Sequence, residues 1–183
     1  GAASVNTLQI VNYLEFGRCL DVTDTNINNS YMIAYPCKQD PSGTGTPAGT
    51  GKLDWNHKWY YKEPPAPATS LTQTISVRVN NNTSQTYCLT TPTTAGAIYP
   101  TFASCGGQDS QKWTRINDTN VYLDSYMFVD YLGRCLSVGK SSDLYKGWSK
   151  IVVATCDRSL AQKWNSPPAS SGGEVGGYRE YTP

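Results

Sequence analysis

The chain has 183 residues, which is enough for one domain with a hydrophobic core or for two small ones. Only 16% of the residues are charged, and 15 basic against 14 acidic residues leave a formal net charge of +1. That balance excludes the strong positive field expected of a nucleic-acid-binding protein or of one held on an anionic membrane. No apolar run approaches the roughly 18 residues that a membrane-spanning helix needs, so neither nucleic acid nor a membrane is an expected partner.

Short β-prone runs alternate with turn residues along the chain. Examples lie at residues 8–11, 32–35, 75–79 and 150–154. No helical period of apolar residues persists for three turns. Many short strands without a helix predict an all-β fold that is closed, so that no strand edge is left free.

One motif occurs three times in chain order. It reads Gly-Arg-Cys-Leu-Asp-Val at 17–22, Thr-Tyr-Cys-Leu-Thr-Thr at 86–91 and Gly-Arg-Cys-Leu-Ser-Val at 133–138. Each copy is followed by a second cysteine and then by a polar-x-Trp triplet that ends at Trp59, Trp113 or Trp164. Features that recur in a fixed order at similar spacings are the signature of internal repeats.

The repeats predict one domain over residues 1–165, with copies at about 8–61, 72–116 and 120–165. Residues 166–183 have no core-forming pattern and are interpreted as a linker or a loosely held tail. In the second and third repeats the triplet Trp follows the second cysteine by eight residues, whereas Trp59 follows Cys37 by 22. The difference is a 14-residue insertion at 41–54, whose Gly, Thr and Pro content predicts a flexible surface loop.

Six cysteines are distributed two to a repeat. Their even number and the absence of a Cys-x-x-Cys pair favour disulfides and an oxidising compartment, either secreted or on the extracellular face of the cell envelope. A zinc site is the alternative, but His57 is the only histidine, and no metal or other cofactor is expected. The repeats predict the pairs Cys19–Cys37, Cys88–Cys105 and Cys135–Cys156.

Three cysteine pairs in register with three Gln-x-Trp-like triplets, over about residues 8–165, resemble the ricin B-type lectin domain. The resemblance implies a β-trefoil, which is a six-stranded barrel capped by three hairpins with pseudo-threefold symmetry. It also implies that the three triplet Trp side chains pack near the symmetry axis, as core residues rather than ligand contacts. The implied function is non-catalytic carbohydrate binding.

The resemblance implies which positions form a sugar pocket. They are an Asp after Cys-Leu, an aromatic residue two positions before the second cysteine, and an Asn before the Gln of the triplet. A carboxylate accepts strong hydrogen bonds from sugar hydroxyls, an aromatic ring covers the C–H face of the sugar, and an amide both donates and accepts. The first repeat carries all three residues as Asp21, Tyr35 and Asn56, with His57 in place of the Gln.

Two roles are possible for each of three features of the first repeat, which are His57, the insertion and Trp55. His57 either hydrogen-bonds Asp21 or the ligand, with titration near its usual pKa of about 6.5, or it satisfies local backbone groups. The insertion lies between Tyr35 and Asn56, so it is expected to emerge beside the pocket as a lid or as a tolerated loop. Trp55, at its end, is either a second stacking surface or a side chain packed beneath the loop.

The second and third repeats lack the pocket residues. Thr90 and Ser137 replace the Asp, Ala103 and Ala154 replace the aromatic residue, and Ser110 and Ala161 replace the Asn. Phe102 or Trp148 offers a shifted aromatic platform, but no carboxylate stands at the matched positions. Both repeats are predicted not to bind sugar.

The predicted function is therefore carbohydrate binding through one pocket in the first repeat. The expected ligand is a glycan with a terminal galactose-type sugar, while pentoses and other hexoses remain open. One such site binds weakly, so the domain is expected to be tethered to a larger secreted or surface protein. The alternatives are a protein-recognition β-trefoil with a vestigial sugar site and an enzyme. No catalytic constellation is apparent beyond carboxylate pairs such as Asp21 and Asp24, so catalysis is not expected.

Overall fold

A computed structural model describes residues 8–15, 17–38, 53–117 and 125–165. The predicted tail and most of the predicted insertion lie outside these residues. The described residues form 14 short strands and no α-helix, which confirms the all-β prediction. The strands are β1 (Val11–Asn12), β2 (Arg18–Asp21), β3 (Ile33–Pro36), β4 (Ser70–Gln73), β5 (Ser76–Arg78), β6 (Thr86–Thr90), β7 (Thr101–Ser104), β8 (Trp113–Ile116), β9 (Met127–Asp130), β10 (Arg134–Val138), β11 (Leu144–Tyr145), β12 (Trp148–Ser149), β13 (Ile151–Thr155) and β14 (Trp164–Asn165).

Within the described ranges, six single-turn 3-10 helices lie between the strands. They are η1 (Thr23–Thr25), η2 (Trp55–His57), η3 (Val79–Asn81), η4 (Thr83–Gln85), η5 (Asp109–Gln111) and η6 (Leu160–Gln162). The turns η2, η5 and η6 each end at the first residue of the polar-x-Trp triplet of their repeat. The three triplets therefore share one local backbone conformation, although the first repeat carries the insertion.

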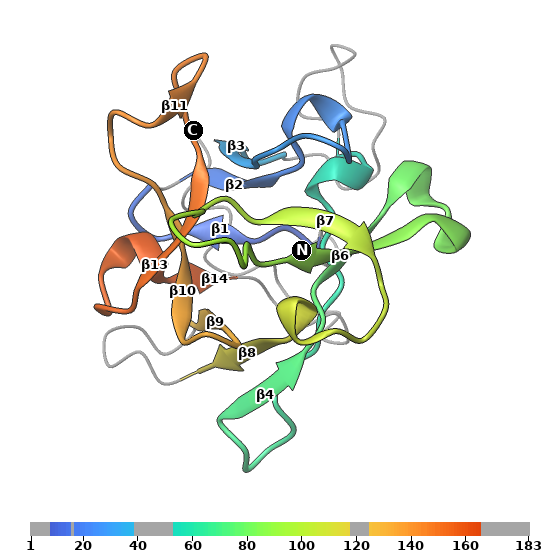
Figure 1. Ribbon diagram of the computed structural model, residues 1–183, viewed down its shortest axis with the longest axis vertical. Coiled ribbons are helices and arrows are strands. Elements are labelled where there is room, and N and C mark those ends of the chain that lie inside the picture. Colours follow the sequence, from blue (N-terminus) through green and yellow to red (C-terminus); the bar gives the residue numbers. More distant parts are fainter. Residues whose placement is uncertain (1–7, 16, 39–52, 118–124, 166–183) are drawn as a thin grey trace, which may run out of the picture.

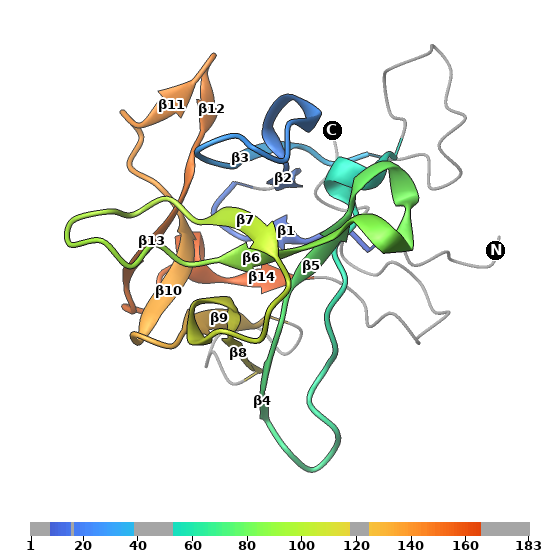
Figure 2. The same cartoon turned by 45° about the vertical axis from the view of Figure 1, so that its right-hand side comes forward.

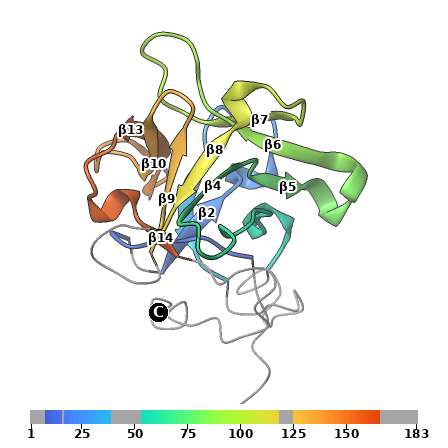
Figure 3. The same ribbon diagram turned by 90° about the horizontal axis from the view of Figure 1, so that it is seen from below.

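The strands form four antiparallel sheets, in the orders β14-β1-β2-β3, β13-β10-β9-β8-β4, β5-β6-β7 and β11-β12. Figures 1 and 2 show the sheets wrapped around one centre, and Figure 3 shows β8, β9 and β10 side by side. Pairing between repeats closes the barrel. The first repeat meets the third through β1 and β14, the second meets the third through β8 and β9, and the first meets the second through a bridge between Tyr60 and Ser76.

Each repeat carries the disulfide that the repeats predicted. Cys19 is bonded to Cys37, Cys88 to Cys105, and Cys135 to Cys156, with Cα–Cα separations of 5.1, 5.0 and 5.1 Å. In every repeat the first cysteine lies on the first strand of a hairpin, and the second follows the end of the second strand. The disulfide prediction is confirmed, and the zinc alternative is wrong.

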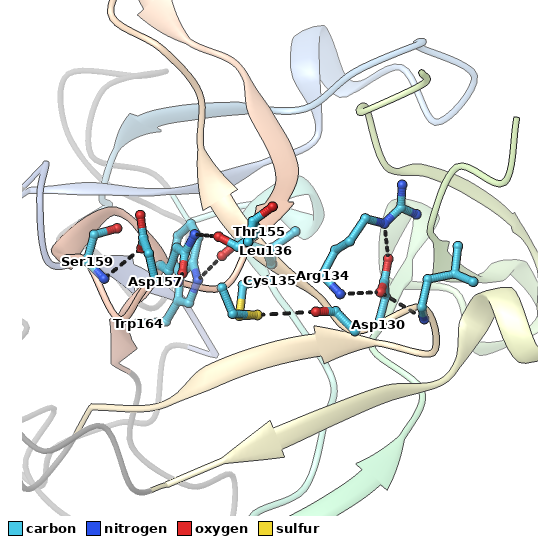
Figure 4. The surroundings of a disulfide bond; sticks show 12 residues. Asp130, Arg134, Cys135, Leu136, Thr155, Asp157, Ser159 and Trp164 are labelled. Carbon is cyan, nitrogen blue, oxygen red and sulfur yellow. Dashed lines mark hydrogen bonds and ion pairs between the residues drawn. A yellow bond between two sulfur atoms is a disulfide. The ribbon is translucent and has the colours of Figure 1, made fainter. Parts of the chain in front are cut away.

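The three triplet Trp residues occupy equivalent places in one core. Trp59, Trp113 and Trp164 have no exposed surface. Their indole N–H groups donate to the carbonyl oxygens of the Leu that follows the first cysteine of the same repeat, at 3.1, 3.0 and 3.1 Å. Figure 4 shows this bond for the third repeat, between Trp164 and Leu136. Because the bond satisfies the one polar atom of each indole, the ring can be buried completely.

The buried carboxylate of Asp130 in the third repeat pairs with Arg134 and binds a residue of the second repeat. The Asp130 side chain is fully buried and lies 2.9 Å from Arg134 Nε (Figure 4). The carboxylate also accepts hydrogen bonds from the backbone N–H groups of Leu132 and Arg134, at 3.0 and 2.8 Å, and from the Thr91 hydroxyl at 2.6 Å. These bonds hold the turn between β9 and β10 against the segment that follows β6.

Candidate functional site

A cavity of about 420 Å³ lies between the first and third repeats. Its lining residues are Asp21, Asp24, Thr25, Ile33, Tyr35, Lys38, Asp54, Asn56, His57, Tyr145, Lys146 and Trp148. Most of them come from the first repeat, and the β11–β12 hairpin of the third repeat supplies one wall. Figures 1 and 2 show this hairpin standing beside β3. The cavity contains Asp21, Tyr35, Asn56 and His57, which are four of the five predicted sugar-site residues.

Backbone contacts bring Asp21 and Asn56 together from positions far apart in the sequence. Asp21 ends β2, and Asn56 lies in the middle of the η2 turn. The Asp54 carboxylate caps this turn by accepting from the backbone N–H of Trp55 at 2.7 Å, and the Asn56 carbonyl accepts from the backbone N–H of Val22 at 3.0 Å. In this arrangement Asn56 Nδ2 donates to Asp21 Oδ1 at 2.6 Å.

His57 approaches the same carboxylate. Its Nε2 lies 3.3 Å from Asp21 Oδ1, and the two side chains are 1% and 6% exposed. The other ring nitrogen, Nδ1, is buried and has no hydrogen-bond partner among the described residues. Of the two roles considered for His57, the structure shows contact with Asp21 and no backbone hydrogen bond to the ring within the described part of the chain.

Burial moves the pKa values of both Asp21 and His57 away from their ordinary values. Desolvation raises the pKa of Asp21 to about 7, against the lowering effects of the Asn56 hydrogen bond and the Lys38 charge, while the nearby Asp24 raises it further. Desolvation, aided by the charge of Lys38, lowers the pKa of His57 to about 3. The expectation that His57 titrates near 6.5 is therefore wrong, because the ring is buried. Asp21 is the group of this pair that changes charge near neutral pH.

The histidine replaces a glutamine that has an anchoring role in the other two repeats. Gln111 and Gln162 each accept a hydrogen bond from the backbone N–H of the residue after the second cysteine, at 3.0 and 2.9 Å. Each also donates to the backbone carbonyl just before that cysteine, at 3.0 and 2.8 Å. These bonds fix the chain as it leaves the disulfide.

In the first repeat this anchoring role is taken by Gln9, a residue outside the triplet. The residue after the second cysteine is Lys38, whose backbone N–H donates to Gln9 Oε1 at 2.7 Å. Gln9 Nε2 in turn donates to the Lys38 carbonyl at 2.8 Å. Because Gln9 holds this segment, the side chain at position 57 is not required there and can face Asp21.

Two aromatic side chains from different repeats form one side of the cavity. Tyr35 lies on β3, Trp148 lies on β12, and their ring centroids are 4.8 Å apart in an edge-on arrangement. The guanidinium of Arg18 lies 4.6 Å from the Trp148 ring centroid, and Lys38 Nζ lies 5.0 Å from that of Tyr35. The sequence offers Trp148 only as a shifted platform for its own, third repeat. The sequence does not predict that Trp148 lines the cavity of the first repeat, because this contact joins two different repeats.

A hydrogen bond fastens the hairpin wall to the first repeat. The Tyr145 hydroxyl donates to Asp24 Oδ2 at 2.6 Å, and the Tyr145 ring packs against Tyr31 with centroids 5.5 Å apart. The hairpin turns at Lys146 and Gly147, which have φ values of +49° and +85°. Positive φ at Gly147 suits a residue without Cβ and allows so tight a turn. The hairpin therefore places Tyr145, Lys146 and Trp148 along one edge of the cavity.

Trp55 does not line the cavity. Its side chain is 4% exposed and belongs to the same hydrophobic core as Trp59. Of the two arrangements considered for Trp55, the packed one is found, and the ring offers no surface for stacking. Residues 39–52, which contain most of the predicted insertion, lie outside the described residues.

At the matched positions of the other repeats, the side chains face internal partners. The Thr90 hydroxyl donates to the Cys88 carbonyl at 3.0 Å, and the buried Ser137 hydroxyl donates to the Val138 carbonyl at 2.8 Å. Phe102, considered as a shifted platform, stacks against Trp59 with ring centroids 5.8 Å apart. None of these side chains supplies a carboxylate, and Phe102 packs on the Trp59 ring instead of standing free as a platform.

The described residues hold neither a membrane-spanning helix nor a cluster of metal-ligating side chains. No helix among them is long and apolar enough to cross a membrane. Within the same residues, no group of three or more His, Cys, Asp and Glu side chains is placed to hold a metal ion.

Comparison with known proteins identifies the architecture. The sequence matches the family model of the ricin-type beta-trefoil lectin domain over residues 6–164. This match, together with the three disulfide-bonded repeats, confirms the β-trefoil prediction. A search of curated proteins found no significant match.

Several solved structures are similar in fold at low sequence identity. ThreeFoil, a designed 3-fold symmetric protein, is 15% identical with a TM-score of 0.56, over 86% of this chain and 94% of that one. The hemolytic lectin CEL-III is 15% identical with a TM-score of 0.53, over 91% of this chain but 32% of that one. An exo-β-1,3-galactanase from Clostridium thermocellum is 15% identical with a TM-score of 0.56, over 87% of this chain and 29% of the enzyme. This chain thus corresponds to less than a third of two of these three proteins.

Proposed function

Because this chain belongs to the ricin-type β-trefoil lectin family, we propose that it binds carbohydrate through the one cavity beside Asp21. The observation that carries the proposal is the hydrogen bond from Asn56 to Asp21, two residues that line that cavity. The amide occupies Asp21 Oδ1, and Oδ2 has no hydrogen-bond partner among the described residues. A carboxylate oxygen and an amide oxygen side by side suit a pair of adjacent sugar hydroxyls.

The aromatic side of the cavity supports a sugar rather than a more polar ligand. Tyr35 and Trp148 present ring surface that matches the C–H face of a pyranose, while the carboxylate binds the hydroxyl edge. The ligand that we propose is a terminal galactose-type sugar or a related hexose or pentose. Binding involves no catalysis, and the second and third repeats contribute scaffold and, in the case of Trp148, part of the wall.

A single site of this kind binds weakly. One stacking contact contributes about 0.5–1.5 kcal/mol and each charged hydrogen bond about 1.5–3 kcal/mol. After the cost of immobilising the sugar, a free energy near −4 to −6 kcal/mol corresponds to a Kd from roughly 40 μM to 1 mM. We therefore propose that the domain targets a larger secreted or cell-surface protein to glycans. The galactanase and CEL-III structures support this, since the matching region is a part of each chain.

A glycan array probed in parallel with the wild type and Asp21→Asn tests the proposal. The wild type is expected to bind glycans with terminal galactose-type or related sugars, in competition with the free sugar, and the variant is expected to lose this binding while it stays folded. Retained binding by the folded variant would exclude the Asp21 cavity as the site. An empty array for the wild type, with a defined protein complex captured from its native surroundings, would favour a protein-recognition module.

A further inference from the structure

A second cavity, of about 550 Å³, lies where the first repeat passes into the second. Its lining residues are Tyr60, Tyr61, Lys62, Leu71, Thr72, Gln73, Thr74, Ser76 and Arg78, and none of them lines the first cavity. Figures 1 and 2 show β4 and the segment before it extending from the barrel as a long loop. The cavity lies at the base of this loop, between residues 60–62 and strands β4 and β5.

Two sets of hydrogen bonds join the segments that form the walls of this second cavity and fix the distance between them. Tyr60 and Ser76 exchange backbone hydrogen bonds of 2.8 and 3.0 Å. In the second set, Gln73 Oε1 accepts from the backbone N–H of Lys62 and Gln73 Nε2 donates to the Lys62 carbonyl, at 2.5 Å each. A cavity formed in advance does not have to be ordered when a ligand binds, which favours affinity.

All the charged side chains that line the second cavity are positive. Arg78 and Lys62 line it, and no Asp or Glu does. The Arg78 guanidinium lies 3.8 Å from the ring centroid of Tyr60, which orients its flat face and leaves its N–H edges for other partners. Among the described residues four ion pairs occur, and Arg78 takes part in none of them. The first cavity is different, because three carboxyl groups line it beside two lysines.

We propose that this second cavity binds a carboxylated sugar, such as a uronic acid residue of a glycan chain. The sugar carboxylate pairs with the edge of the Arg78 guanidinium through two parallel hydrogen bonds, with Lys62 as a second cation. The exposed hydroxyl of Thr74 and that of Ser76 are available to the sugar hydroxyls, and the side chains of Leu71 and Tyr61 cover its C–H face. The site shares no lining residue with the Asp21 cavity, and it takes an anionic sugar where the first cavity takes a neutral one.

Titration of the full 15N-labelled chain with glucuronate, followed by NMR, tests this second site. Saturable shifts are expected at the Arg78 Nε–H signal and at the amides of residues 60–62 and 71–78. Methyl glucuronate, glucose and acetate serve as controls, because each lacks either the charge or the sugar ring. All three are expected to bind at least about tenfold more weakly, since charge-assisted hydrogen bonds and ring contact both contribute.

Matched variants locate the binding. Arg78→Gln is expected to weaken glucuronate binding about tenfold or more, and Lys62→Gln, whose side chain is exposed, by a smaller factor. Lys140→Gln removes one exposed charge away from both cavities and should leave binding unchanged, as should Asp21→Asn. Equal binding of the methyl ester or of acetate, or unchanged binding in both Arg78→Gln and Lys62→Gln, would overturn the proposal. Because Asp21→Asn reports only on the first cavity, the two sites can fail independently.

Discussion

The Trp148 ring of the third repeat lies with its centroid 4.8 Å from that of Tyr35 in the first, so two repeats complete one cavity. Replacing Trp148 by Ala removes aromatic surface from this cavity without touching Asp21. We expect sugar affinity to fall roughly three- to tenfold, which is the contribution of one aromatic contact. Isothermal titration with the sugar identified on the array measures the change. Tyr131→Ala, which removes an exposed aromatic ring from the turn between β9 and β10, is the matched control and should bind like the wild type.

The pH dependence of sugar binding is expected to follow Asp21. Sugar hydroxyls donate to the carboxylate, so the ionised form binds, and burial raises the pKa of this group to about 7. Affinity should therefore rise with pH, by up to about thirtyfold between pH 5.5 and pH 8.5, since about 3% of the groups are ionised at the lower value. Titration calorimetry at four pH values gives the profile.

Two variants separate Asp21 from His57 in that profile. His57→Gln should keep the rise with pH, because burial lowers the pKa of the histidine to about 3, below the range tested. Asp21→Asn should bind weakly and equally at every pH. A profile that disappears in His57→Gln would instead assign the titration to the histidine.

The Gln9 anchor gives a prediction about stability. Gln9→Ala leaves the backbone N–H and carbonyl of Lys38 without their partners, and the expected loss is about 1–3 kcal/mol of unfolding free energy. Urea unfolding measures it. Gln9→Glu keeps the acceptor and loses the donor, so an intermediate loss should follow. Because η2 ends at position 57 as η5 and η6 end at Gln111 and Gln162, adding His57→Gln to Gln9→Ala should restore part of the lost stability.

The buried carboxylate of Asp130 should matter more for stability than an exposed one. Asp130→Ala leaves the Thr91 hydroxyl and the backbone N–H groups of Leu132 and Arg134 without this acceptor, and about 3 kcal/mol of unfolding free energy should be lost. The Arg134 guanidinium, whose side chain is 26% exposed, keeps the Pro92 carbonyl as an acceptor. Asp109→Ala breaks an ion pair with Lys112 in which both side chains are largely exposed. Such surface pairs contribute at most about 1 kcal/mol. Similar losses in the two variants would contradict a structural role for Asp130.

Features that recur within each repeat could be predicted from the sequence. The disulfide pairs follow from the spacing of the repeats, and the core positions of Trp59, Trp113 and Trp164 follow from the family resemblance that those repeats carry. The resemblance also implies Asp21 and Asn56 as pocket residues, and in the structure Asn56 Nδ2 lies 2.6 Å from Asp21 Oδ1.

Contacts between repeats could not be predicted in this way. Trp148 and Tyr145 reach the first cavity because the barrel closes, and closure leaves no periodic pattern in the sequence. The burial of individual side chains could not be predicted from the sequence either. Whether His57 titrates near 6.5 or about 3, and whether Trp55 faces solvent or core, depends on how much protein surrounds each side chain.

The pairing of β1 with β14 has a consequence for how such a domain combines with other sequences. Val11 lies opposite Asn165 in this antiparallel pair, so the chain comes into the barrel and goes out of it at neighbouring points. A unit with adjacent ends can be spliced into a surface loop of a host protein without forcing that loop apart. The same adjacency should tolerate circular permutation, in which a short peptide joins the old ends and new ones open at an exposed turn.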